Sequence, residues 1–156
     1  MKKYLNALAS LGAGMLLAPC AHAAEDTISK EASADITYVY SSGQGMGSVT
    51  LLHAISSDFR SGTLNKPKKL LWLKYEVASY PQAFSDRVEL CYFEPYRSSP
   101  SKCRELPGGA SDTTQLFNDL RFDAGAYVQI QHYLKGAPGT NLRPSGKERV
   151  TWKYSY

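Results

Sequence analysis

Histidine and cysteine are scarce in this chain, which has three of each among 156 residues. A structural zinc site needs about four ligands, and no C-x-x-C or paired-histidine spacing supplies them here. No thiol pair is spaced for redox catalysis, and no G-x-S-x-G sequence places a serine nucleophile. We therefore expect no metal, no cofactor and no enzymatic activity.

Long apolar runs are almost absent. The one that exists, residues 5–17, is too short to cross a bilayer. Lys2 and Lys3 precede it, and Ala21-His22-Ala23 follows it as an A-x-A cleavage site. This pattern predicts a secretory signal peptide over residues 1–23, cleaved near Ala23, and export to a bacterial periplasm.

The three cysteines divide between the signal peptide and the exported chain. Leu17-Ala18-Pro19-Cys20 resembles a lipobox with proline at a position that favours a small residue, so lipid attachment through Cys20 is the less favoured alternative. Cleavage leaves Cys91 and Cys103 in an oxidising compartment. They lie in two strand-like runs on either side of a loop rich in proline and serine, which predicts a disulfide across a β-hairpin. Closing so short a loop stabilises the fold by roughly 3 kcal/mol. The alternative is that both cysteines are free, buried thiols.

Neither sign of charge dominates. Without Lys2 and Lys3, 16 basic residues face 14 acidic ones, a net charge near +2 that gives no basis for nucleic-acid binding. The remaining length of about 130 residues suits one domain. We expect a flexible leader over residues 24–35, because that segment is polar and lacks periodicity, and a single β domain over residues 36–156.

Long helical patterns are also absent, and short alternating runs separated by glycine- and proline-rich turns take their place. The expected strands are Ile36–Tyr40, Ser48–Ser56, Lys69–Ala78, Arg87–Phe93, Lys102–Leu106, Thr113–Phe117, Ala126–Lys135 and Glu148–Tyr156. Residues 69–78 carry apolar side chains on both faces, which is typical of a central strand. The fold class is all-β, an antiparallel β-sandwich, with a small β-barrel as the alternative.

Two histidines remain in the exported chain, His53 and His132. Each falls on the apolar face of its predicted strand; Val49, Leu51 and Ile55 share that of His53. The two histidines could meet in space as metal ligands or as a catalytic centre. We interpret them instead as histidines of the core or its rim.

Tyrosine, in contrast, is abundant, with 11 in the chain. Tyr127 and Tyr133 share the outward face of a predicted strand with Gln129 and Gln131 between them. Such a face could bind a polypeptide or a glycan, and the alternative is that a second sheet or a loop covers it. The candidate binding residues are Tyr92, Tyr96, Tyr127, Gln129, Gln131 and Tyr133.

The order of several short motifs resembles a known family. The motifs are Gly45-Met46-Gly47 leading into Val49 and Leu51, the aromatic pair Trp72 and Tyr75, Leu90-Cys91, Cys103-Arg104-Glu105-Leu106, Thr113-Thr114, and Val150-Thr151-Trp152-Lys153-Tyr154. Over residues 43–156 this order is similar to that of the periplasmic flagellar FlhE family. The resemblance implies a small soluble periplasmic β protein that is tied to flagellar export and motility. It also implies action by contact, as a chaperone or as a brake on proton leakage through the export apparatus, and it brings no catalytic residues.

We therefore expect a non-enzymatic periplasmic accessory protein whose partners are flagellar export or rod and hook proteins. A second hypothesis is a periplasmic inhibitor or immunity protein that blocks a cell-wall hydrolase, with the loop between Cys91 and Cys103 as the inserted segment.

Overall fold

The computed structural model describes residues 23–45 and 47–156, so the predicted signal peptide up to His22 and the lipobox cysteine Cys20 lie outside the described residues. The described chain forms strands and one 3-10 turn, η1 (Ser56–Asp58). None of its described helices has the length and apolar character needed to cross a membrane.

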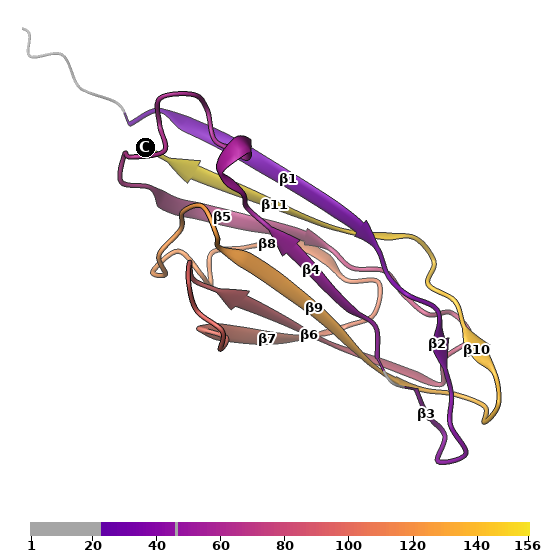
Figure 1. Ribbon diagram of the computed structural model, residues 1–156. Coiled ribbons are helices and arrows are strands. Elements are labelled where there is room, and N and C mark those ends of the chain that lie inside the picture. The colour runs from indigo at the N-terminus through magenta and orange to yellow at the C-terminus, as the bar shows by residue number, and fades with distance from the viewer. Residues whose placement is uncertain (1–22, 46) are drawn as a thin grey trace, which may run out of the picture.

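One layer is a four-stranded antiparallel sheet (Figure 1). Its strands, in spatial order, are β1 (Glu25–Ser33), β11 (Lys147–Ser155), β5 (Lys69–Glu76) and β8 (Ser111–Thr114). β5 lies between two neighbours, which confirms that residues 69–78 supply a central strand.

The other layer is a five-stranded antiparallel sheet built around β9 and β6. Its strands are β3 (Gln44–Gly45), β4 (Val49–His53), β9 (Tyr127–Lys135), β6 (Ser85–Phe93) and β7 (Lys102–Pro107). β3 and β4 both pair with β9, and β7 forms the far edge beside β6. A short ribbon of β2 (Thr37–Tyr38) and β10 (Asn141–Leu142) lies at one end of the molecule.

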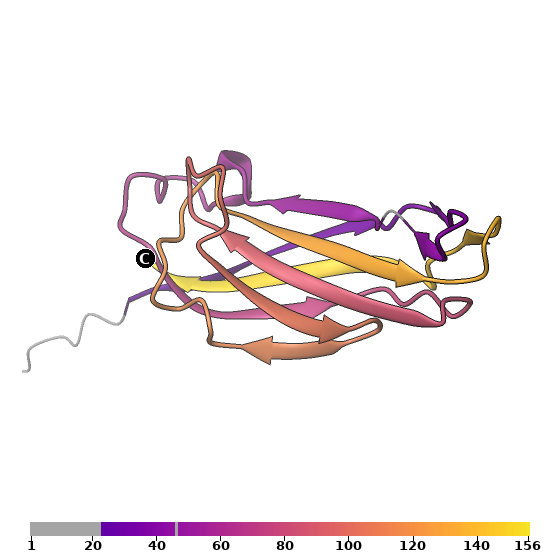
Figure 2. The same ribbon diagram turned by 90° about the horizontal axis from the view of Figure 1, so that it is seen from below.

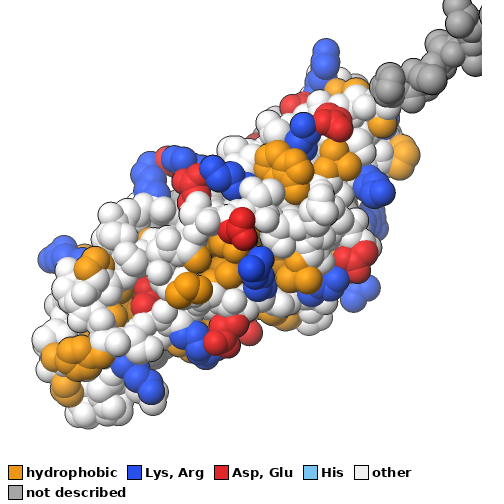
Figure 3. Space-filling model, turned by 180° about the vertical axis from the view of Figure 1, so that it is seen from behind, with side chains coloured by type: hydrophobic (Ala, Val, Ile, Leu, Met, Phe, Trp, Pro, Cys, Tyr) orange, Lys and Arg blue, Asp and Glu red, His pale blue; other side chains and the backbone are white. Residues whose placement is uncertain are grey.

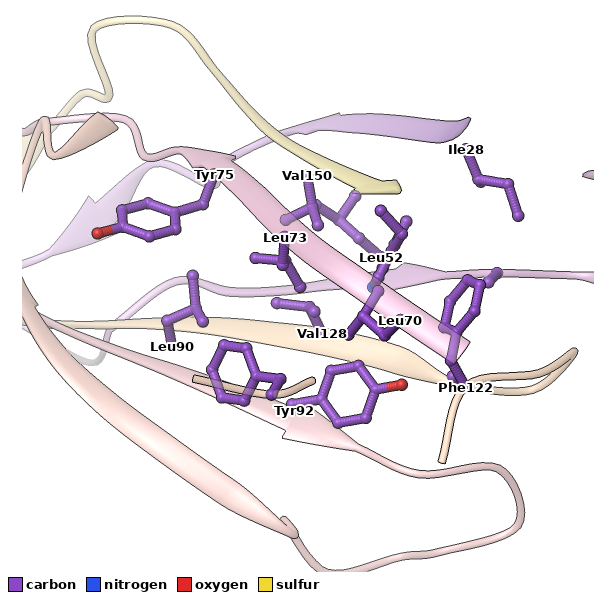
Figure 4. Packing of buried hydrophobic residues seen from close by; sticks show 14 of the residues in the cluster. Ile28, Leu52, Leu70, Leu73, Tyr75, Leu90, Tyr92, Phe122, Val128 and Val150 are labelled. Carbon is purple, nitrogen blue, oxygen red and sulfur yellow. The ribbon is translucent and has the colours of Figure 1, made fainter. Parts of the chain in front are cut away.

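The two sheets lie on each other as an open sandwich, which confirms the predicted fold class and excludes the barrel alternative (Figure 2). Inward side chains of both sheets meet between the layers, where Leu73 and Val150 approach Leu90 and Val128 (Figure 4). Trp152 is fully buried among them. The alternation of apolar residues along each strand produces this core, because successive side chains point to opposite faces.

The predicted flexible leader is wrong. Residues 25–33 form β1, which pairs along its whole length with β11, from Glu25 opposite Ser155 to Ser33 opposite Lys147. Ile28 anchors the strand, since only 4% of its surface is exposed. The outward side chains are polar because they face charged partners on β11, and this polarity concealed the strand in the sequence. The β domain therefore includes residues 25–33.

The predicted inward face of β4 is also wrong. Thr50, Leu52 and Ala54 point into the core, whereas Val49 and Leu51 are each nearly half exposed, at 46% and 47%. Leu51 and Leu52 are adjacent, so each side of the strand carries a leucine. Alternation therefore predicts a strand but does not show which side is buried.

The strand predicted over residues 113–117 is displaced towards the N-terminus, because β8 runs from Ser111 to Thr114 and the chain then turns. Phe117 lies in that turn and is nevertheless fully buried in the core.

The glycine-rich segment before β4 is a connection between β3 and β4. Gly47 lies against β9, where a Cβ atom on it would come within 1.3 Å of the carbonyl oxygen of His132. Only glycine allows this approach, and it lets the Ser48 carbonyl accept a hydrogen bond of 3.0 Å from the His132 backbone N–H. The glycine therefore serves strand packing.

Candidate functional site

The side of the five-stranded sheet that points away from the core carries most of the predicted binding residues. We call it the outer face. The antiparallel register aligns its side chains in rows across the strands. The outer face consists of Val49, Leu51 and His53 on β4, Tyr127, Gln129, Gln131 and Tyr133 on β9, Arg87, Glu89, Cys91 and Phe93 on β6, and Cys103 and Glu105 on β7.

A ladder of stacked rings forms one end of the outer face. Tyr127 stacks between His53 and Phe93, with ring centroids 4.6 Å and 4.3 Å apart. The three residues are direct cross-strand partners, so the register places their rings in line. Stacking of this kind stabilises neighbouring strands. His53 is the exposed member of the ladder, Tyr127 is half-buried and Phe93 is buried.

The central row of the outer face contains no charged residue. Leu51, Gln129, Cys91 and Cys103 form one row across four strands. The two cysteines are bonded to each other across β6 and β7, with Cα atoms 4.1 Å apart, which confirms the predicted disulfide. Gln129 donates a hydrogen bond of 3.1 Å from Nε2 to Oε1 of Gln131 on the same strand.

Charged residues appear only towards the other end. The guanidinium of Arg87 lies 4.1 Å from the ring centroid of Tyr133 and 3.1 Å from Oε2 of Glu105. The Tyr133 hydroxyl donates a hydrogen bond of 3.2 Å to Oε2 of Glu89. Partial burial, followed by the negative charge of Glu89, raises the pKa of Tyr133. A groove of about 410 Å³ continues from this end, between Arg87 and Lys135.

The outward side of the four-stranded sheet differs from the outer face because ion pairs connect its strands. Glu31 of β1 pairs with Lys147 and Arg149 of β11, and Arg149 also reaches Glu76 of β5 at 3.2 Å. Hydrogen bonds from Lys147 and then Arg149 lower the pKa of Glu31 to about 2. Figure 3, seen from behind, shows basic and acidic side chains interspersed with apolar ones on that face of the molecule. On the outer face, in contrast, the exposed apolar side chains are Val49, Leu51 and Tyr133. Neighbouring exposed apolar side chains on a sheet can form an interaction surface.

Four of the predicted binding residues come together as proposed: Tyr127, Gln129, Gln131 and Tyr133 share one side of β9. Tyr92 does not, and its inclusion was wrong. It is fully buried, stacks on Phe117 at 5.5 Å, and donates a hydrogen bond of 2.9 Å to the Arg121 carbonyl. The alternation of β6 indicates that Tyr92 is buried, because it lies on the same side of the strand as Val88 and Leu90. Val49 and Leu51 of the outer face were missed because they were assigned to the core.

Tyr96 lies apart from this surface, in the loop between β6 and β7. It is 89% exposed, and its φ of 64° lies in the left-handed region, where a tyrosine is strained. Glu94 organises the loop by accepting hydrogen bonds from the Arg121 backbone N–H at 3.0 Å and the Ser101 hydroxyl at 2.9 Å. The first of these bonds contributes most to lowering the pKa of Glu94. The loop thus presents an aromatic side chain on an ordered base.

His132 lies inside the molecule, between two carboxylates that the sequence did not link to it. Its Nδ1 is 2.7 Å from Oδ1 of Asp86 on β6, and its Nε2 is 2.7 Å from Oε1 of Glu148 on β11. His132 and Glu148 are both fully buried. Burial opposes protonation of His132, but the hydrogen bonds to Asp86 and Glu148 outweigh it and raise the pKa of the imidazole to about 9. The histidine is therefore a cation at neutral pH and holds the two sheets together.

The two histidines do not meet. His53 points outward from β4, whereas His132 points inward from β9, so no shared metal or catalytic site forms between them. Within residues 23–45 and 47–156, the one close group of possible metal ligands is Glu89 with Cys91 and Cys103. The sulfurs of that group are already bonded to each other.

Comparison with known proteins gives fold similarity only. No protein-family model and no curated protein sequence matches the chain. A crystal structure of FlhE superposes with a TM-score of 0.56 and 18% identity, covering 86% of this chain and all of the FlhE chain. A structure of turnip yellow mosaic virus reaches a TM-score of 0.44 at 10% identity, covering 96% of this chain and 89% of its own. A structure of Desmodium yellow mottle tymovirus also reaches 0.44, at 13% identity, covering 99% of this chain and 94% of its own. The chain is thus similar in fold to FlhE.

Proposed function

We propose that this chain is a non-enzymatic periplasmic accessory protein of the flagellar system that acts by binding another protein through the outer face. The observation that carries this proposal is the contrast between the two sides of the sandwich. Ion pairs link the strands of the four-stranded sheet, whereas the outer face exposes Val49 and Leu51 beside the half-buried Tyr127 and Gln129. Aromatic and apolar side chains with few charges are typical of the centre of a protein–protein interface.

Two further observations support the flagellar assignment. The fold is similar to that of FlhE, and the motif order over residues 43–156 resembles the same family. The Cys91–Cys103 disulfide suits an oxidising compartment such as the periplasm. The proposed partners are flagellar export or rod and hook proteins, and no nucleic acid, metal or cofactor takes part.

The outer face suits either of the two modes that the family resemblance implies. A chaperone would cover apolar surface of an exported subunit, and a brake on proton leakage would seal a surface of the export apparatus. Both modes need a broad face with little charge, because uncompensated charge at the centre of an interface costs binding energy.

Replacing Gln129 with lysine tests the proposal. Gln129 lies at the centre of the outer face between Leu51 and Cys91, so the new ammonium group would have to be desolvated on binding. We expect the Gln129→Lys protein to fold normally but to lose most of its ability to restore swarming and cytoplasmic pH in a flagellated host that lacks the gene. The matched control is Thr27→Lys, which adds the same charge to the exposed outward side of β1 and should restore both.

The proposal fails if deletion of the gene changes neither swarming nor cytoplasmic pH. It also fails if Gln129→Lys and Thr27→Lys restore them equally well, because contact through the outer face would then be unnecessary.

Tyr96 favours a second candidate function, inhibition of a cell-wall hydrolase. A strained, exposed aromatic residue on an ordered loop is a plausible element for insertion into an enzyme cleft. This function predicts inhibition of a lysozyme-like or amidase enzyme by the wild-type protein and its loss in Tyr96→Ala. A panel of such enzymes that retains full activity in the presence of the wild-type protein would remove this candidate.

A further inference from the structure

β4 has an open edge. Within the described residues it pairs only with β9. The Ser48 carbonyl accepts from His132 N–H at 3.0 Å, and Ala54 N–H donates to the Ala126 carbonyl at 2.9 Å. Because backbone groups alternate in direction along an antiparallel strand, Thr50 and Leu52 also face β9. The N–H and C=O groups of Val49, Leu51 and His53 therefore point away from the sheet.

The other long edges of the sandwich are protected against strand pairing. Charged side chains, a proline or short length are the usual means. The protecting residues are Glu25, Asp26, Lys30 and Glu31 on β1, Lys102, Arg104, Glu105 and Pro107 on β7, and Asp112 on the four-residue β8. β4, with the sequence VTLLH, contains no Lys, Arg, Asp, Glu or Pro. Its open edge is thus the one best suited to accept a strand.

β4 and β1 are edge strands of different layers of the sandwich (Figure 1). An extended segment would add to the open edge of β4 as a further strand of the five-stranded sheet.

Charge at the two ends of β4 indicates how such a segment would be composed. Asp35 is exposed beside the start of β4, where its backbone N–H donates to Oγ of Ser48 at 2.9 Å, and its carboxylate forms no ion pair within the described residues. At the other end, Lys30 is already paired with Asp58 at 2.7 Å. A segment that is apolar at alternating positions and carries Lys or Arg next to Asp35 would match both the strand and this charge.

We propose that β4 is a site of β-strand addition for such an extended segment of another polypeptide. The segment would hydrogen-bond to the open groups of Val49, Leu51 and His53, and its alternate side chains would extend the outer face beside Leu51. This inference rests on the proposed contact function and specifies the class of partner.

Selection from a random-peptide phage library on the purified mature protein tests the inference. We expect selected peptides to alternate apolar residues and to carry a flanking Lys or Arg. Leu51→Pro and Leu51→Lys should each weaken their binding about tenfold or more, since the first removes an open N–H and the second places a charge at the edge. The proline removes no bond to β9, because the Leu51 N–H points outward. The control Leu116→Lys, at an exposed leucine beyond β8, should bind normally.

Amide hydrogen exchange supplies a second readout that does not depend on a variant folding. In the free protein the amides of Val49, Leu51 and His53 should exchange much faster than those of Thr50, Leu52 and Ala54. A selected peptide should slow the first three about tenfold or more.

Several outcomes would overturn strand addition: no selected peptide, binding unaffected by Leu51→Lys, protection of the Val49, Leu51 and His53 amides in the free protein, or a dimer that Leu51→Lys abolishes. Peptides that bind but respond only to Gln129→Lys would overturn strand addition while leaving contact through the outer face intact. Failure of the Gln129→Lys swarming test would remove the proposed function and leave the peptide result standing.

Discussion

Replacing His132 with alanine is expected to lower the free energy of unfolding by about 3–5 kcal/mol. The protonated imidazole lies 2.7 Å from both Asp86 and Glu148, and Glu148 is fully buried. Without the cation, two carboxylates remain on the inner surfaces of β6 and β11 with no opposite charge between them. The substitution also removes the ring that packs edge-on against Tyr80, with centroids 5.0 Å apart.

Chemical denaturation of His132→Ala and His53→Ala, compared with the wild type, measures this effect. His53 is the other histidine among the described residues, but it is exposed. Its replacement should therefore cost less than about 1 kcal/mol, through the lost stacking on Tyr127. Similar losses in the two variants would contradict the role assigned to His132.

The same cluster predicts a dependence of stability on pH. The pKa of His132 is about 9 in the folded protein and near its ordinary value of 6.5 in the unfolded chain. A raised folded-state pKa stabilises fully below pH 6.5, and this contribution is lost as pH rises through 9. The difference corresponds to at most about 3 kcal/mol. Wild-type and His53→Ala stability should therefore fall across this range, and His132→Ala should lack the decline; a decline of equal size in His132→Ala would assign it to other groups.

Removal of the disulfide is expected to have the second largest effect. Replacing Cys91 and Cys103 together with alanine should lower the free energy of unfolding by about 2–4 kcal/mol, mainly because the unfolded chain gains freedom when the loop is no longer closed. The two residues are separated by 12 positions and lie directly opposite each other on β6 and β7. The fold should persist, since the core between the sheets does not depend on this bond.

Denaturation of the double variant, with circular dichroism to verify the strands, provides the measurement. Thiol titration of the denatured mature wild-type protein, without reductant, should detect no free cysteine. Two reactive thiols, or a double variant as stable as the wild type, would contradict a structural role for the bond.

The parts of the structure that follow from local alternation could be predicted from the sequence. β9 alternates Val128, Ile130 and His132 with Tyr127 and Gln129, and the structure buries the first set and leaves the second outward. The hairpin of β6 and β7 with its disulfide could also be predicted, because a loop rich in proline and serine separates two strand-like runs that each carry one cysteine.

Other parts depend on neighbours that are distant in the sequence. β1 is a strand because Glu31 faces Lys147 and Arg149 more than 100 positions away, and no local pattern contains that information. His132 lies 46 positions from Asp86 and 16 from Glu148, so their cluster became visible only with the sheet register.

Which side chains of β4 face solvent could not be predicted from its local sequence either. Its outward side chains remain in solvent because, within the part of the chain that the structure describes, no further strand or layer covers them. This is also why the exposed apolar part of the outer face was missed in the sequence.

Site-specific photo-crosslinking in a flagellated host tests the proposed contact most directly. A benzophenone amino acid would replace Tyr133 on the outer face, and Trp72, on the outward side of the four-stranded sheet opposite Lys153, would be replaced as the aromatic control. We predict an ultraviolet-dependent adduct with a flagellar export, rod or hook protein at position 133 and none at position 72. Equal adducts at both positions, or none at position 133 in cells that assemble flagella, would contradict contact through the outer face.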